Sequence, residues 1–223
     1  MCANYGLDPR FGDVHFDDEP DAELVEALRT WADRNAGEVI RPTGRRLRNL
    51  NPIVVGRGGA PALEEAWWGL LVDGAPARFP SINTRSERVR QSPDGLAGRA
   101  IVPATSWYEM QKPSRVWNEF TLAGRAVFGM AAVTRLCHTD DGSWLTCYSI
   151  LMRPAPPRLA GIHERMPVLL SPGLAREWLT ARPSRALMDD VLLASEDVAR
   201  WVEAATIAGR PDDRRRELST APA

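Results

Sequence analysis

Lysine is almost absent from this chain of 223 residues: Lys112 is the only one, and every other fixed cation is an arginine. Primary amines are therefore limited to Lys112 and the amino terminus, which argues against Schiff-base chemistry at any other position. A guanidinium group binds phosphate oxygens through two parallel hydrogen bonds, so arginine would make most contacts with a phosphate-bearing ligand.

Cysteine is also scarce. Cys2, Cys137 and Cys147 make an odd count and contain no C-x-x-C pair. This pattern argues against a disulfide framework and against a zinc knuckle. We expect Cys137 and Cys147 to be buried strand residues, and we expect no metal ion and no organic cofactor.

The chain has no run of about 18 apolar residues, and its first residues lack a basic region followed by an apolar stretch. We therefore expect a cytoplasmic protein with no membrane partner. The net charge of −1 argues against a protein that coats nucleic acid through bulk charge, but it leaves a local basic groove open.

Hydrophobic periodicity and turn residues predict one domain over residues 1–210 and a polar, disordered tail over 211–223. Strands gather in the middle of the chain and helices at its ends. Because the two do not alternate, we predict an α+β fold with a mainly antiparallel, barrel-like sheet core and flanking helices. The predicted helices are 18–36, 85–91, 172–180 and 185–207. The predicted strands are 52–55, 65–72, 99–109, 116–123, 125–134, 144–152 and 168–170, with a hairpin at Ala123-Gly124.

The residue at position 2 can have a distinctive reactivity. Methionine aminopeptidases remove Met1 when the second residue is small, and Cys2 would then carry an α-amine with a pKa near 8 beside a thiol with a pKa near 8.5. This 1,2-aminothiol can condense with an aldehyde to an imine, and the thiolate can close on the imine carbon to give a thiazolidine. The alternative is that a cysteine at position 2 has no role.

Three further polar residues each have a plain and a functional interpretation. Asn83 either lies in a helix-entry loop or belongs to a site. Glu109, at the end of an apolar strand, is either at the rim of the sheet or a buried acid whose raised pKa suits proton transfer. His163, between a Pro/Ala-rich loop and an apolar strand, is either a surface residue or a proton carrier.

A basic segment lies nearer the N-terminus. Residues 41–49 include Arg41, Arg45, Arg46 and Arg48 and no acidic residue. The segment is either a solvated loop or an edge that binds phosphate groups.

Taken together, these pieces resemble the SRAP family, the SOS response-associated peptidase fold, whose members crosslink to abasic sites in single-stranded DNA. The resemblance covers about residues 1–182. Its motifs are Met1-Cys2, Trp68-Gly69-Leu70, Ile82 to Glu87, Arg99 through Pro103-Ala104, Trp107-Tyr108-Glu109 and Ile162 to Val168.

The resemblance implies that Cys2 is the nucleophile, Asn83 orients the sugar, Glu109 acts as acid and base, and His163 shuttles protons. It implies single-stranded DNA with abasic sites as the partner, at the nucleoid when the protein is bound, and we expect a monomer. The residues expected to contact DNA are Arg41, Arg45, Arg85, Arg165 and Trp68. For Arg85 and Arg165 a second interpretation stays open, in which they pair with carboxylates of the pocket.

The chain departs from the family pattern in several places. Ala3-Asn4 replaces the usual Gly-Arg after Cys2, and Leu71 to Gly74 replaces a segment that usually carries a wedge tryptophan. Ser106 and Met110 replace the glycine and tryptophan around Glu109, residues 39–43 lack the usual asparagine, and the chain beyond residue 182 lacks the usual ending. These changes affect the expected DNA groove more than the expected reaction centre.

Three alternatives stay open. The first is a non-covalent single-stranded DNA binder derived from the family. The second is an N-terminal-nucleophile amidohydrolase, although its usual His-Thr-Arg and Asn-Gly-Asp segments are missing. The third is an N-terminal-cysteine peptidase, for which we identify no oxyanion hole.

Overall fold

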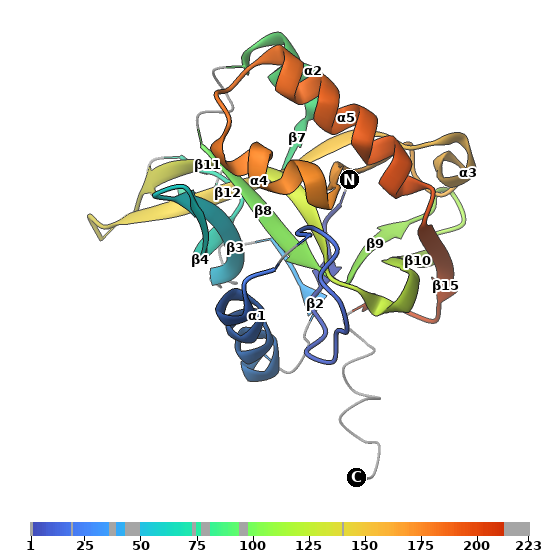
Figure 1. The fold of residues 1–223 in the computed structure, drawn as a ribbon. Helices are drawn as coiled ribbons and strands as arrows, with labels where there is room; N and C mark the ends of the chain where they lie inside the picture. The colour runs from blue at the N-terminus through green and yellow to red at the C-terminus, as the bar shows by residue number, and fades with distance from the viewer. Residues whose placement is uncertain are drawn as a thin grey trace.

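The computed structural model describes residues 2–18, 20–35, 39–42, 50–72, 75–76, 81–93, 98–139 and 141–211. Figure 1 shows strands in the centre and helices at the periphery. The helices are α1 (Ala22–Arg34), α2 (Ser86–Gln91), α3 (Pro157–Ala160), α4 (Pro172–Thr180) and α5 (Arg185–Ala199). The strands are β1 (Tyr5–Gly6), β2 (Val39–Ile40), β3 (Leu50–Arg57), β4 (Ala60–Trp68), β5 (Leu71–Val72), β6 (Ala75–Pro76), β7 (Asn83–Arg85), β8 (Arg99–Ala104), β9 (Ser106–Met110), β10 (Trp117–Leu122), β11 (Phe128–His138), β12 (Trp144–Pro154), β13 (Arg165–Pro167), β14 (Leu169–Leu170) and β15 (Val202–Ile207).

Five strands close into a barrel. β4 pairs with β3, β3 with β8, β8 with β11 and β11 with β12, and β12 returns to β4 through a parallel pairing. Closure removes the exposed strand edges that an open sheet would leave. Strand β14 also pairs with β11, and strands β7 and β13 pair with β12, with β7 parallel to it.

A second, antiparallel sheet lies beside the barrel in the order β15-β10-β9-β1-β2. Only Thr105 separates β8 from β9, so the chain passes directly from the barrel into this sheet. The α+β class and the mainly antiparallel, barrel-like core predicted from the sequence are confirmed.

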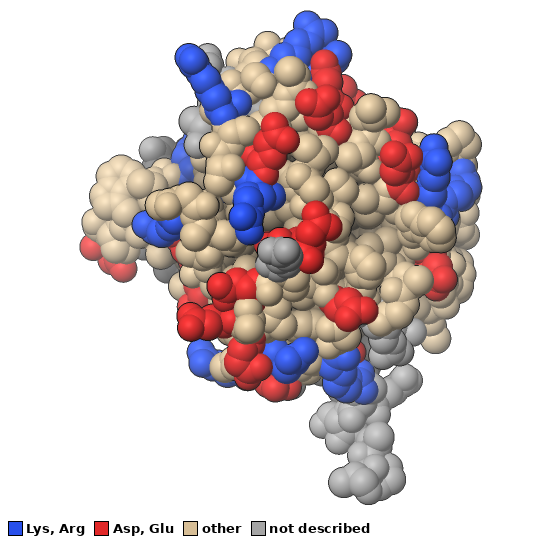
Figure 2. Space-filling model, in the orientation of Figure 1, with Lys and Arg blue, Asp and Glu red and all other residues tan. Residues whose placement is uncertain are grey.

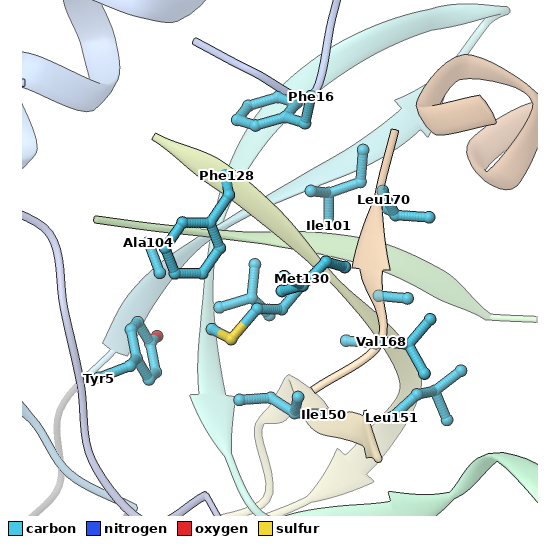
Figure 3. Close-up of a cluster of buried hydrophobic side chains, with 14 of the residues drawn as sticks. Tyr5, Phe16, Ile101, Ala104, Phe128, Met130, Ile150, Leu151, Val168 and Leu170 are labelled. Atoms are coloured by element: carbon cyan, nitrogen blue, oxygen red, sulfur yellow. The ribbon is translucent and has the colours of Figure 1, made fainter. Parts of the chain in front are cut away.

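The barrel interior is filled by apolar side chains. Figure 3 shows residues from β8, β11, β12 and β14 meeting in one cluster, with Tyr5 and Phe16 at its side. Phe128, Met130, Ile150 and Leu151 are fully buried. Burying each such side chain contributes about 1.5–3 kcal/mol relative to leaving it in water, which makes this cluster the main source of stability.

The helices form where sequence signals place them. Asp21 caps α1, its Oδ1 accepting hydrogen bonds from the N–H groups of Glu23 and Leu24 at 2.8 and 3.0 Å. Ser184 caps α5 by accepting from the N–H of Leu187 at 3.0 Å. In the described residues no helix is both long and apolar enough to cross a membrane.

Two sequence predictions are wrong at one edge of the second sheet. Residues 202–207 are strand β15 and not the end of a helix, because they pair along the full length of β10. The predicted hairpin at Ala123-Gly124 is a short 3₁₀ turn instead. Both edges of β10 are occupied by β9 and β15, so β10 cannot pair with β11, which belongs to the barrel.

The predicted strand over 52–55 is part of a longer hairpin. β3 and β4 pair from Leu50–Trp67 to Arg57–Ala60, around a two-residue turn in which Gly58 and Gly59 both have positive φ. Such a turn matches the twist of the strands it joins and needs glycine. The predicted 211–223 tail, apart from Pro211, lies outside the described residues.

Candidate functional site

Cys2 lies at the junction between the two sheets. It precedes β1, whose Tyr5 pairs with Trp107 of β9, and the carbonyl of Asn4 accepts from the N–H of Tyr108 at 3.0 Å. Continuing this register brings Cys2 alongside the end of β9 that carries Glu109. The thiol is fully buried and donates to the carbonyl of Asn4 at 3.6 Å.

Burial, together with the negative charge of Glu109, raises the pKa of the Cys2 thiol well above its usual range. The thiol is therefore protonated at neutral pH. An attack by this sulfur needs a nearby base at the moment of bond formation.

Asn83 holds the backbone of Cys2. β7 places Asn83 beside Ile150 of β12, and its Nδ2 donates to the carbonyl oxygen of Cys2 at 2.7 Å. The Oδ1 of Asn83 is buried and accepts no hydrogen bond within the described part of the chain. A hydroxyl group of a ligand would satisfy it.

Glu109 is a buried acid on β9. It is only 3% exposed, and burial raises the pKa of its carboxyl group to about 7. A carboxyl group with this pKa is present in both protonation states near neutral pH, which is the condition for efficient general acid–base catalysis.

His163 faces Glu109 from the loop between α3 and β13. Its Nε2 lies 3.9 Å from Glu109 Oε2, and its Nδ1 lies 2.9 Å from the carbonyl oxygen and 3.1 Å from the nitrogen of Arg165. Either tautomer therefore finds a backbone partner at Nδ1. Burial lowers the pKa of His163, so the imidazole is neutral at neutral pH and can carry a proton in either direction.

The structure thus brings Cys2, Asn83, Glu109 and His163 together from four separate segments. The cluster offers a thiol, an amide with a free acceptor and a carboxyl–imidazole pair. This set can hold a polar electrophile and move protons to and from it. No group of three or more His, Cys, Asp or Glu side chains in the described residues is arranged to hold a metal ion.

Comparison with known proteins places the chain in a family. The family model of the SOS response associated peptidase (SRAP) matches residues 21–208. The chain belongs to the SRAP family.

Curated SRAP relatives carry the name abasic site processing protein. YobE of Bacillus subtilis is 27% identical over 140 residues, which cover 58% of this chain and 64% of YobE. YedK of Escherichia coli is 32% identical over 124 residues, which cover 52% of this chain and 54% of YedK. The match therefore spans less than two thirds of the length of these relatives.

Solved structures share the SRAP fold. A protein from Bordetella bronchiseptica has a TM-score of 0.65 at 22% identity, over 93% of this chain and all of that one. A protein from Bacteroides thetaiotaomicron has a TM-score of 0.65 at 16% identity, over 95% of this chain and 97% of that one. At these identities the likeness is one of fold.

Two SRAP motifs are joined by an ion pair. Nη1 and Nη2 of Arg165 each donate to the carboxylate of Glu87 at 2.8 Å, and Nη1 also donates to the carbonyl of Met152 at 3.3 Å. These bonds with Arg165 hold the pKa of Glu87 below its usual value. The structure therefore contains the ion pair that the second interpretation of Arg165 predicts. A phosphate contact by Arg165 stays a prediction.

The structure describes two of the three other arginines that were expected to contact DNA. Arg41 and Arg85 are exposed at the surface, where a phosphate group could reach them. Arg45 lies outside the described residues, together with Arg46 and Arg48.

Trp68 of the SRAP W-G-L motif is a core residue. It is fully buried, it stacks on Tyr148 with ring centroids 6.1 Å apart, and its indole N–H donates to the carbonyl of Ile82 at 2.9 Å. A ring with no exposed surface cannot stack on a base, so the expected DNA contact of Trp68 is corrected to a packing role. By fixing Ile82, Trp68 positions the neighbouring Asn83.

Sequence reasoning missed a pair of tyrosines near Cys2. The hydroxyl groups of Tyr5 and Tyr148 lie 2.7 Å apart, both residues are fully buried, and the ring of Tyr5 packs edge-on against Trp68 at 5.0 Å. The alternation of apolar and polar residues around Tyr5 is too short to predict this contact, which depends on pairing across the two sheets.

Proposed function

We propose that this protein processes abasic sites in single-stranded DNA by forming a covalent thiazolidine between Cys2 and the ring-opened abasic sugar. The observation that carries the proposal is the placement of Cys2 beside Asn83 and the buried Glu109, whose carboxyl pKa is about 7. The names of the SRAP relatives support the substrate class.

The reaction requires removal of Met1. The freed α-amine of Cys2 attacks the aldehyde carbon of the open sugar to give a carbinolamine. Loss of one water gives the imine. The nitrogen keeps its own N–H hydrogen, so the imine forms in its protonated state. The sulfur of Cys2 then bonds to the imine carbon, and the thiol proton passes to Glu109, which replaces the proton given to the departing water. The sum is aldehyde plus aminothiol giving thiazolidine plus one water, with no oxidant and no cofactor.

Glu109 supplies the proton that the departing water needs and accepts the thiol proton afterwards. A group with a pKa of about 7 performs both steps near neutral pH. His163, 3.9 Å from Glu109, relays protons between this carboxyl group and the sugar oxygens, which assists ring opening. Asn83 offers its buried Oδ1 to a sugar hydroxyl while its Nδ2 fixes the carbonyl of Cys2.

Arginine side chains are proposed to hold the DNA strand. Arg41 and Arg85 are exposed, and Arg45 belongs to the same basic segment as Arg41. Arg165 would contact a phosphate only by sharing its guanidinium group with Glu87. Contacts with phosphate groups position a strand without reading its sequence.

The test is adduct formation on a denaturing gel, with a single-stranded oligonucleotide that carries one abasic site. Wild-type protein should give a band that survives denaturation, and Cys2→Ala should give none. Cys137→Ala is the matched control, because Cys137 is also buried but lies in a different cluster from Cys2, and it should crosslink like the wild type.

Each remaining outcome points to another function. If Cys2→Ala keeps its affinity for intact single strands and the wild type forms no adduct, the protein is a non-covalent DNA binder. If neither adduct nor DNA binding is found, the proposal is wrong, and hydrolysis of peptides or amides becomes the activity to assay.

A further inference from the structure

The turn between β9 and β10 is a short basic loop whose position follows from that of Glu109. Glu109 lies near the end of β9, and Gln111 follows the strand directly. The turn is closed by two backbone hydrogen bonds of 2.8 Å, from the N–H of Gln111 to Val116 and from the N–H of Arg115 to Gln111. The strand pairing therefore fixes the turn at the same end of the sheet as the candidate site.

A side-chain hydrogen bond ties this turn to the loop that carries His163. The Nε2 of Gln111 donates to the carbonyl of Gly161 at 2.9 Å, two residues before His163. Burial is the main cause of the lowered pKa of His163, and the positive charge of Lys112 acts in the same direction. The ammonium group of Lys112 therefore lies within electrostatic reach of the site.

The turn presents two cations that the proposed chemistry does not use. Lys112 and Arg115 are both exposed, and neither has an ion-pair partner among the residues that the structure describes. The neighbouring loop also carries one exposed carboxylate, Glu164, whose charge acts on His163 in the opposite sense. The turn itself, residues 111–116, carries these two cations and no carboxylate.

The rest of the visible surface offers no broad field of one sign. Figure 2 shows Lys and Arg side chains intermingled with Asp and Glu over the face that it draws. With a net charge of −1, attraction of a polyanion depends on a few well-placed cations and not on bulk charge.

We propose that Lys112 and Arg115 form a phosphate clamp at the rim of the site and contact backbone phosphates of the DNA strand next to the abasic nucleotide. The proposal rests on the proposed function, because it takes the strand that carries the lesion as the ligand. A phosphate contact binds any base sequence, which suits a lesion that has lost its base. The only lysine of the chain would thus serve in binding, and the aldehyde would be left to Cys2.

The test is the salt dependence of equilibrium binding to an intact single-stranded oligonucleotide. Removing one phosphate-binding cation should reduce the slope of log K against log salt by about 0.7. We expect this reduction in Lys112→Ala and in Arg115→Ala, and about twice the reduction in the double variant. Lys112→Arg should keep the wild-type slope, because it keeps the charge.

Arg135→Ala is the matched control. Arg135 is an exposed arginine on β11, and the hairpin of β11 and β12 projects from the opposite side of the molecule to β9 and β10 (Figure 1). Its removal should leave the slope unchanged. A single neutral methylphosphonate at the contacted phosphate should also abolish the effect of Lys112→Ala.

Slopes that are equal in Lys112→Ala, Arg115→Ala and the wild type would overturn the clamp. So would an equal reduction in Arg135→Ala, because the effect would then be one of net charge. Failure of the proposed function is read separately, as absence of a Cys2 adduct in the wild type. If the wild type forms the adduct but the variants have unchanged slopes, only the phosphate clamp is refuted. If the variants have reduced slopes but the wild type forms no adduct, Lys112 and Arg115 belong to a non-covalent DNA-binding surface.

Discussion

Burial of Glu109 makes the stability of the fold depend on pH in the opposite sense to a paired surface carboxylate. Its pKa is about 7 in the folded chain and about 4.3 in an unfolded one, so the folded state binds the extra proton between these values. Stability from this group is therefore lost as pH rises through that window, by about 4 kcal/mol at most.

Glu109→Gln removes this dependence. The unfolding free energy of each protein is measured with urea at pH 5 and at pH 8. We expect the variant to be more stable relative to the wild type at pH 8 than at pH 5. Comparison with the wild type cancels the carboxylates whose pKa is lowered, such as Glu87 and Asp189, which act in the other direction. An unchanged difference between the two proteins would show that Glu109 is ionised in the folded state.

The same substitution tests the proposed chemistry. Glutamine can neither donate the proton that the departing water takes nor accept the proton of the thiol. We expect Glu109→Gln to slow adduct formation by about 10²–10⁴-fold at pH 7, measured as single-turnover rates on an abasic oligonucleotide. A rate close to that of the wild type would contradict the role of Glu109.

Trp68 is predicted to act through the fold. Trp68→Phe loses the hydrogen bond to the carbonyl of Ile82 and leaves a cavity, so we expect a loss of about 1–3 kcal/mol in unfolding free energy. Trp144→Phe, at a tryptophan that is 64% exposed, should change stability by less than about 0.5 kcal/mol. If Trp68→Phe has unchanged stability but binds DNA more weakly, Trp68 contacts DNA directly, as first expected from the sequence.

At the scale of elements, most of the secondary structure that depends on neighbouring residues could be predicted from the sequence. The helix over 172–180 and the apolar strand over 144–152 are predicted from neighbouring residues alone, and both are confirmed as α4 and β12. The prediction of a helix over 202–207 was wrong because Ala204 and Ala205 favour a helix in isolation. Its strand conformation depends on hydrogen bonds with β10, whose paired residues lie 80 to 90 positions away in the chain.

This conflict gives a prediction about β15. Ala204 is exposed and lies opposite Phe120, so Ala204→Val adds strand propensity and a cross-strand contact, and it should stabilise the fold by about 0.2–1 kcal/mol. The control is Ala186→Val, at an exposed position of helix α5, which should destabilise by about 0.5 kcal/mol. Denaturant unfolding measures both. Destabilisation by both substitutions would mean that 202–207 behaves as a helix in solution.

At the scale of the whole molecule, the candidate site exists because two sheets meet. Cys2 and Glu109 come together through the pairing of β1 with β9, and Asn83 is placed by the parallel pairing of β7 with β12. Neither pairing can be read from residue spacing. The sequence could name these residues through a family resemblance, but their proximity and the burial that sets the pKa of Glu109 follow only from the assembled fold.

The central claim is that the amino and thiol groups of Cys2 together form the covalent bond. The most direct measurement is the intact mass of the denatured adduct with an abasic oligonucleotide. The account predicts the mass of the chain without Met1, plus the oligonucleotide, minus one water, with both the amine and the thiol of Cys2 resistant to alkylation. An adduct that retains Met1, or one whose Cys2 thiol is still free to react, would contradict it.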